Sequence, residues 1–208
     1  MTVDRQGELI LFAPAGCSPE RLSDFVQEKR FWIYRKLAEK ELVQVPPARK
    51  EYVTGEGFPY LGRSYRLQLV DDQSVPVKLA GGRFKMLRSA ASDGDRHMTS
   101  WYRTRGERWL TARVVRLASR VGTHPAGVVV RELAYRWGSC GKGGVISFHW
   151  RTVMLPPRIV DYILVHELAH LAEAHHGPAF WRAVERGMPD FAARKQWLVE
   201  NGARTIAL

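Results

Sequence analysis

Apolar residues recur with two different periods along this chain of 208 residues, and each period predicts one kind of element. Alternation of apolar and polar residues over 64–70 predicts a half-buried strand. Apolar and β-branched runs between turn residues predict further strands over 7–13, 51–53, 58–61, 75–79, 84–87, 128–133 and 145–155. Apolar residues three and four apart predict helices over 19–42, 97–121, 157–176, 178–186 and 191–201. The pattern indicates an α+β fold with a β-rich N-terminal portion.

A stretch of small polar residues at 89–95 predicts a loose boundary between two portions of the chain. We expect an N-terminal α/β portion over 1–95, with β-hairpins such as the one around 80–83, and a second domain over 96–208. The first portion has 15 basic and 13 acidic residues, net +2, and the second has 17 and 8, net +9.

The Arg-rich second half is compatible with weak association with nucleic acid or nucleotides. An arginine-rich composition without such a partner is slightly favoured, because no nucleic-acid-binding motif accompanies the charge. Arg113, Arg116 and Arg120 lie together on the predicted helix 97–121, either as a solvated face or as a row that faces phosphate.

The sequence also predicts where the protein works. It has no run of eighteen apolar residues, so we expect no membrane span. Its first residues lack the basic and apolar regions of a signal peptide. The two cysteines, Cys17 and Cys140, do not suggest a disulfide framework, so we expect a cytoplasmic protein.

The strongest chemical signal is the pentapeptide H-E-L-A-H at 166–170. On a helix, His166 and His170 share one face, one turn apart, and two such imidazoles can bind one Zn²⁺ at roughly 2.0–2.1 Å each. Glu167 points to the side of that face, where it can take a proton from a metal-bound water without being a ligand. The flanking apolar residues predict that this helix is largely buried, where unpaired His and Glu would be costly.

The third ligand has several candidates after the motif. His175 would face away from His170 if the helix continued, whereas His176 borders the Gly177-Pro178 break, where the chain can turn back. His176 is therefore favoured over His175. Glu173 lies on the face of His170, and we interpret it as a carboxylate that orients a ligating imidazole.

Four motifs in order resemble a known family. They are R-W-G-S-C at 136–140, V-I-S-F-H-W-R at 145–151, H-E-L-A-H at 166–170 and H-G-P-A-F-W at 176–181. This set looks like the YgjP-like metallopeptidase domain, a predicted zinc metallopeptidase group related to the SprT and WLM domains. The resemblance is strongest over roughly 95–203 and looser toward the N-terminus. It implies a small mixed sheet packed on a zincin-like H-E-x-x-H helix.

The resemblance also implies roles for single residues. It implies that His166, His170 and His176 are metal ligands and that Glu167 is the general base. The family usually shows Asn-His-Ser where this chain has His-His-Gly at 175–177. The resemblance further suggests residues that support the ligands or contact substrate, namely Arg136, Trp137, Ser139 and Cys140.

Two other polar residues have competing interpretations. Cys140 as a nucleophile is disfavoured, because zinc chemistry needs no thiolate, and as a zinc ligand it is a weak rival to His176. His149 lies within a predicted strand, where it either faces the site as a proton donor or is a structural histidine with satisfied hydrogen bonds, the favoured interpretation.

We therefore predict a zinc-dependent peptidase that acts on a peptide or protein, with the substrate added as a strand beside the metal helix. One alternative is a phosphohydrolase of the nucleoside triphosphate pyrophosphatase type, in which the Arg-rich half holds the phosphates. A site rich in histidine suits Zn²⁺ better than the Mg²⁺ of such enzymes. Another alternative is a nucleic-acid-associated module whose zinc is structural, with four protein ligands.

Overall fold

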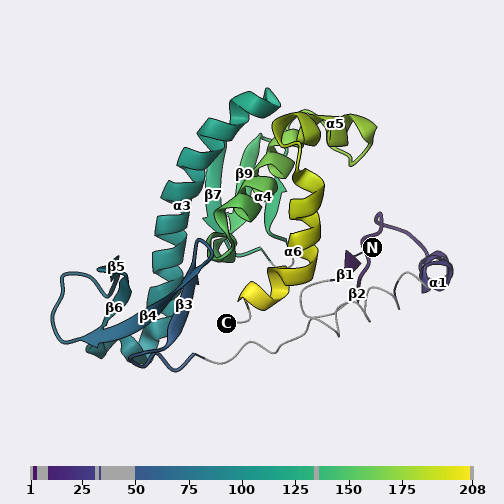
Figure 1. Ribbon diagram of the computed structural model, residues 1–208. Coiled ribbons are helices and arrows are strands. Elements are labelled where there is room, and N and C mark those ends of the chain that lie inside the picture. Colours follow the sequence, from purple (N-terminus) through teal and green to yellow (C-terminus); the bar gives the residue numbers. More distant parts are fainter. Residues whose placement is uncertain (1, 4–8, 31–32, 34–49, 134–135, 207–208) are drawn as a thin grey trace. The chain divides into compact units, whose positions relative to one another are not determined.

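The computed structural model describes residues 2–3, 9–30, 33, 50–133 and 136–206 (Figure 1). The chain divides into two contact units, 1–46 and 47–208. In the first unit, β1 (Thr2–Val3) pairs antiparallel with β2 (Leu9–Ile10), and α1 spans Pro19–Glu28. The hydroxyl of Ser18 accepts a hydrogen bond from the Arg21 main chain and caps α1. Of the predicted strand 7–13, Leu9–Ile10 form β2 and 11–13 are not a strand. Residues 7–8, and 31–32 and 34–42 of the predicted helix, lie outside the described residues.

The second unit begins with a mixed four-stranded sheet. Its strands are β3 (Gly57–Tyr60), β4 (Arg63–Val70), β5 (Val77–Ala80) and β6 (Arg83–Leu87), in the order β3-β4-β6-β5. β4 and β6 are parallel, and the register aligns Leu67 with Phe84, so both bury their side chains on one face. The predicted hairpin connects β5 to β6, and Gly81 and Gly82 both adopt positive φ in its turn.

A long helix follows this sheet directly. The 3-10 helix η1 (Arg88–Asp93) continues into α3 (Gly94–Val121), so the polar stretch at 89–95 is helical. The buried Tyr102 hydroxyl of α3 donates a 2.6 Å hydrogen bond to the Pro59 carbonyl of β3. The contact boundary lies between Pro46 and Pro47, and a domain division after residue 95 stays a prediction.

The second sheet contains β7 (Gly127–Arg131), β8 (Gly138–Cys140) and β9 (Val145–His149), in the order β7-β9-β8. β7 and β9 are parallel, and β8 runs antiparallel to β9. The predicted strand 145–155 is wrong beyond His149, where the chain forms the 3-10 helix η2 (Trp150–Met154). The cause is local, because the His149 ring accepts a hydrogen bond from the Arg151 main chain and caps η2.

Three helices complete the fold: α4 (Pro157–Ala169), α5 (Pro178–Gly187) and α6 (Phe191–Ile206). α4 contacts α3, α5, α6 and β8, and most of its residues are buried (Figure 1). The prediction that this helix continues to the Gly177-Pro178 break is wrong, since α4 ends at Ala169 and the chain turns over 170–177. The α+β class and the mixed sheets are as predicted. No helix among the described residues is long and apolar enough to cross a bilayer.

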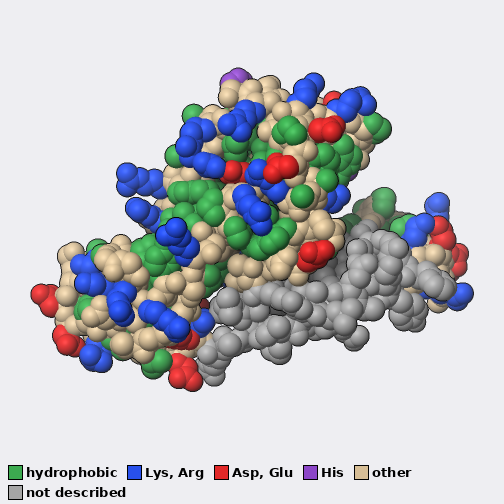
Figure 2. Space-filling view, viewed as in Figure 1, with side chains coloured by type: hydrophobic (Ala, Val, Ile, Leu, Met, Phe, Trp, Pro, Cys, Tyr) green, Lys and Arg blue, Asp and Glu red, His purple; other side chains and the backbone are tan. Residues whose placement is uncertain are grey.

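The predicted arginine row on α3 is interrupted by an ion pair. Arg113 binds both carboxylate oxygens of Asp161 on α4, at 2.6 and 2.5 Å. Arg113 is thus committed to a contact between helices, whereas Arg116 and Arg120 are exposed. Lys and Arg side chains gather along the outer side of α3 (Figure 2). Association of this half with nucleic acid stays a prediction.

We expect Arg113→Ala to destabilise the protein by about 3 kcal/mol, because it leaves the buried Asp161 carboxylate without its partner. Denaturant unfolding followed by circular dichroism measures this change. Arg116→Ala is the matched control on the exposed side of the same helix and should change the free energy of unfolding by less than about 0.5 kcal/mol. Equal stabilities of the two variants would show that the pair contributes little.

Candidate metal centre and catalytic cleft

Three histidines come together at the C-terminal end of α4. His166 lies in its last turn, His170 immediately follows the helix, and His176 lies in the turn before α5. The Nε2 atom of His176 lies 3.1 Å from the Nε2 atoms of both other rings. All three ligand atoms lie within 4.8 Å of one another. The early end of α4 brings His176 to the other two, and His175 is not a member of this group.

Hydrogen bonding determines which nitrogen of His170 faces the group. Its Nδ1 lies 3.0 Å from the main-chain carbonyl oxygen of Glu173. A carbonyl can only accept, so Nδ1 carries the proton and Nε2 presents a lone pair toward His166 and His176. The contact of Glu173 with His170 is therefore made by its main chain, and the role predicted for its carboxylate stays a prediction.

Burial keeps the imidazole of His166 neutral. Burial, then the two neighbouring histidines and Lys195, lowers the pKa of His166 to about 3. Burial and neighbouring positive charges also lower the pKa of His176. Neutral imidazoles are the form that binds metals.

The donor set fits a tetrahedral transition metal. Ligands about 2.0–2.1 Å from such an ion lie roughly 3.3 Å from one another. The two 3.1 Å separations between Nε2 atoms are close to that spacing. Three imidazole nitrogens also suit zinc-like ions better than Mg²⁺ or Ca²⁺.

The first turn of α5 supports the three rings. Phe180 is fully buried, and its ring centroid lies 4.9, 4.5 and 4.7 Å from those of His166, His170 and His176. Trp181 stacks on His176 at 5.8 Å. The apolar spacing of 178–186 predicted that these residues face inward, but their contact with all three rings required the fold.

Glu167 is buried beside the histidines, with 6% of its surface exposed. Burial raises the pKa of Glu167 to about 7, against the opposing effects of the Arg136 charge and a hydrogen bond with the Cys140 main chain. Burial and the charge of Glu167 in turn raise the pKa of the Cys140 thiol, which disfavours a thiolate nucleophile there.

A cleft of about 820 Å³ opens onto these groups. All four residues of the R-W-G-S-C motif that were predicted to support the site, Arg136, Trp137, Ser139 and Cys140, line it. The sequence argument missed other lining residues, among them Tyr162, Lys142, Leu171 and Leu198. Tyr162 could have been found, because it lies one helical turn before His166 on the same face. Lys142 and Leu198 are brought there by tertiary packing.

His149 does not line the cleft. It is fully buried, and its Nδ1 accepts from the Arg151 main chain, so its Nε2 carries the proton toward Glu132 at 2.6 Å. Trp150 donates to the other carboxylate oxygen of Glu132. These contacts support the structural interpretation of His149.

The edge of β8 adjoins the Glu167 carboxylate. Trp137 and Gly141 bond through their main chains to β9, so the main-chain groups of Gly138 and Cys140 face the opposite side. In the described part of the chain, β8 is the outer strand of its sheet. The hydrogen bond of Cys140 with Glu167 lies on this outer side. An extended peptide could therefore pair with β8 beside Glu167.

We expect Gly138→Ala to lower peptidase activity by about 100-fold, because a misplacement of about 1 Å at a reacting group has an effect of that size. A Cβ at this position would lie 2.7 Å from both Cγ and Oε1 of Glu167. Gly143→Ala is the control, since nothing lies within 4 Å of its Cβ, and it should keep near-normal activity. Steady-state kinetics with metal content measured in parallel tests the pair. Normal kinetics for Gly138→Ala would show that Glu167 has freedom to shift.

Three convergent imidazoles beside a buried carboxylate, in a cleft along an edge strand, define a site for metal-dependent hydrolysis. The family model described as "YgjP-like, metallopeptidase domain" matches residues 1–201, and the chain belongs to this family. It is thus a metallopeptidase, a metal-dependent hydrolase with a peptide or protein substrate, as the motifs predicted.

Comparison with other proteins adds one solved structure. The crystal structure of the metallopeptidase zymogen of Pyrococcus abyssi abylysin is 27% identical and covers 46% of this chain and 92% of its own, with a TM-score of 0.40. No curated protein matches the chain.

Proposed function

We propose that the protein is a zinc-dependent peptidase in which His166, His170 and His176 hold the metal and Glu167 is the general base. The observation that carries the proposal is the convergence of three Nε2 atoms beside one buried carboxylate in an open cleft. Three protein ligands leave a coordination position open, as in catalytic zinc sites. When bound, zinc polarises the scissile carbonyl and makes a water molecule more acidic.

Glu167 moves the proton in this scheme. Its carboxylate accepts a proton from the attacking water and delivers it to the nitrogen of the leaving amine. Burial holds the pKa of Glu167 near 7, which suits both acceptance and release of a proton at neutral pH. Arg136 and the Cys140 main chain keep part of the population ionised by opposing the effect of burial.

The substrate lies along β8 in the proposed complex. The outward main-chain groups of Gly138 and the Cys140 carbonyl pair with the peptide as an added strand, which places its backbone beside Glu167. Trp137 and Leu198, which also line the cleft, offer apolar surface for substrate side chains. The proposal uses β8 for the substrate because β9 is the central strand of this sheet and β8 is an outer strand.

The proposal is tested on the full chain by metal analysis and by hydrolysis. We expect about one zinc per chain, cleavage of a peptide library, loss of cleavage with a chelator and recovery on addition of zinc. Lack of peptide cleavage by the zinc-loaded protein would contradict the proposal. Phosphate release from nucleotides with Mg²⁺ or Mn²⁺ would support a phosphohydrolase instead. Zinc held by four protein ligands would support a structural site.

A further inference from the structure

Two basic side chains line the cleft, and a third lies on α6 near the histidines. Arg136 precedes β8, and Lys142 lies in the turn over 141–144 that follows it; both line the cleft. Lys195 of α6 lies with its Nζ 4.3 Å from the centre of the Trp181 ring, which stacks on His176. All three side chains are exposed. A positive charge thus lies at each end of β8, and a third lies on α6.

These charges reach the reacting groups. The positive charge of Arg136 acts on Glu167, and that of Lys195 acts on His166 and His176. Charges on the walls of a cleft have more effect on a ligand than equal charges on an open surface, because the low-dielectric walls focus the field.

Acidic side chains do not balance this charge within the cleft. Among the described residues that line it, Glu167 is the single carboxylate. Lys142 and Lys195 form no ion pair with any described residue. Elsewhere in the described chain, cations such as Arg113, Arg88 and Arg194 are paired with aspartates. Lys142 and Lys195 are therefore available to a bound ligand.

We propose that the cleft selects peptide segments with acidic side chains beside the scissile bond, with Lys142 as a specificity-determining residue. This inference rests on the proposed peptidase function and on binding along β8. A peptide paired with β8 places side chains on both sides of the bond near the two ends of that strand, where Arg136 and Lys142 lie. Glu or Asp there gains an ion pair, whereas Lys or Arg meets like charge.

The test compares matched peptides with the zinc-loaded full-length protein. Starting from a neutral peptide that is cleaved, each of the three positions on either side of the scissile bond is replaced in turn by Glu, Gln or Lys. We expect kcat/KM to be about two- to fivefold higher with Glu than with Gln at one or more positions, mostly through KM. Lys should be the poorest, and the preference should shrink in 0.5 M salt because the charges are screened.

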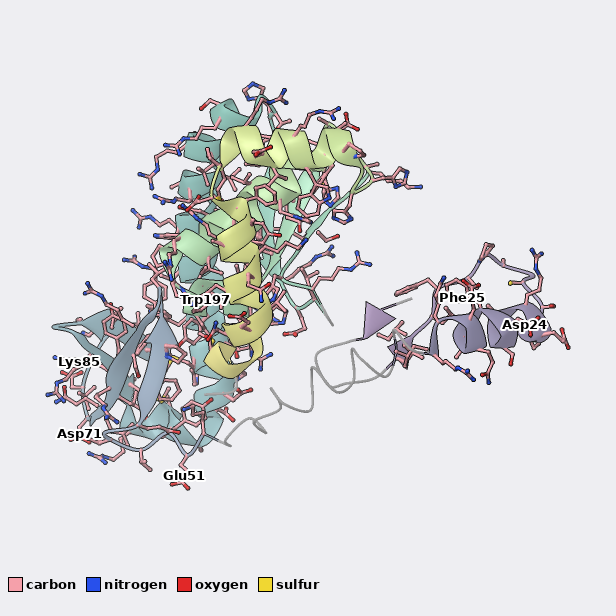
Figure 3. All side chains as sticks on the ribbon, turned by 45° about the vertical axis from the view of Figure 1, so that its right-hand side comes forward. Asp24, Phe25, Glu51, Asp71, Lys85 and Trp197 are labelled. Carbon is pink, nitrogen blue, oxygen red and sulfur yellow. The ribbon has the colours of Figure 1, made fainter. Side chains whose placement is uncertain are left out.

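Variants connect the preference to the residue. Lys142→Glu should remove or reverse the preference at the affected position while neutral peptides are still cleaved. Lys85→Glu is the control, because Lys85 lies on β6 in the four-stranded sheet (Figure 3). Equal kcat/KM for Glu and Gln peptides, or a preference unaltered in Lys142→Glu, overturns the inference and leaves the peptidase intact. Absence of all cleavage instead contradicts the proposed function on which the inference rests.

Discussion

Glu167→Gln should abolish measurable peptide hydrolysis while the protein keeps its metal. The amide has nearly the same shape as the carboxylate but cannot accept a proton from water, and loss of a general base lowers rates by about 10²–10⁴-fold. Stability should stay equal or increase, because burial raises the pKa of Glu167 to about 7 and so opposes its charged form. Neutral glutamine avoids that cost. Kinetics, elemental analysis and thermal unfolding of the same preparation measure all three properties.

The control for this substitution is Glu173→Gln. Glu173 supports His170 through its main-chain carbonyl, which the substitution leaves unchanged. Activity and metal content should therefore stay near those of the unmodified protein. Full activity of Glu167→Gln would remove this residue from its proposed role. A large loss in Glu173→Gln would support the carboxylate role that the sequence first suggested.

His176→Ala should lose the metal, and His175→Ala should keep it. Loss of residues that only support a ligand weakens metal binding by about 10–100-fold, so removal of a ligand should exceed about 100-fold. The two variants change adjacent histidines, of which only His176 belongs to the group. Its Nε2 lies 3.1 Å from the Nε2 atoms of His166 and His170. Elemental analysis after gel filtration against a weak chelator measures the difference.

Thermal unfolding provides a second measurement of metal binding by His175→Ala and His176→Ala. A ligand that binds only the folded state adds about 2.7 kcal/mol when present at 100 times its Kd. Chelation should therefore lower the Tm of His175→Ala as it does for the unmodified protein, and should leave that of His176→Ala nearly unchanged. Retained metal in His176→Ala together with loss in His175→Ala would assign the third ligand to His175.

The core of the site was predictable because its spacing is a property of a single helix. Residues four apart share a face in any α-helix, so His166 and His170 could be paired without knowledge of the fold. The apolar residues around them likewise predicted burial, which Glu167 shows at 6% exposure. The choice of His176 depended on a turn signal at Gly177-Pro178, and the chain does turn back before α5.

The ends of elements were less predictable, because side-chain and tertiary contacts determine them. The apolar pattern of α4 continues past Ala169, but the helix ends there, and the His170 ring bonds the Glu173 carbonyl. The short strand β8 spans three residues, begins with Gly138, a weak strand former, and pairs with β9. Arg113 pairs with Asp161, which lies 48 residues away in the chain, so no local pattern could predict this contact.

The sequence by itself determined the α+β class, the metallopeptidase motif and the two histidines and carboxylate on α4, since periodicity and local spacing encode these. The tertiary structure alone decided which other groups meet them: Gly138 of β8 against Glu167, the Phe180 ring against the imidazoles, Lys142 on the cleft wall and Lys195 on α6. Such contacts join residues far apart in the chain. Their positions follow from how the strands pair and how the helices bury their apolar faces, which no local pattern specifies.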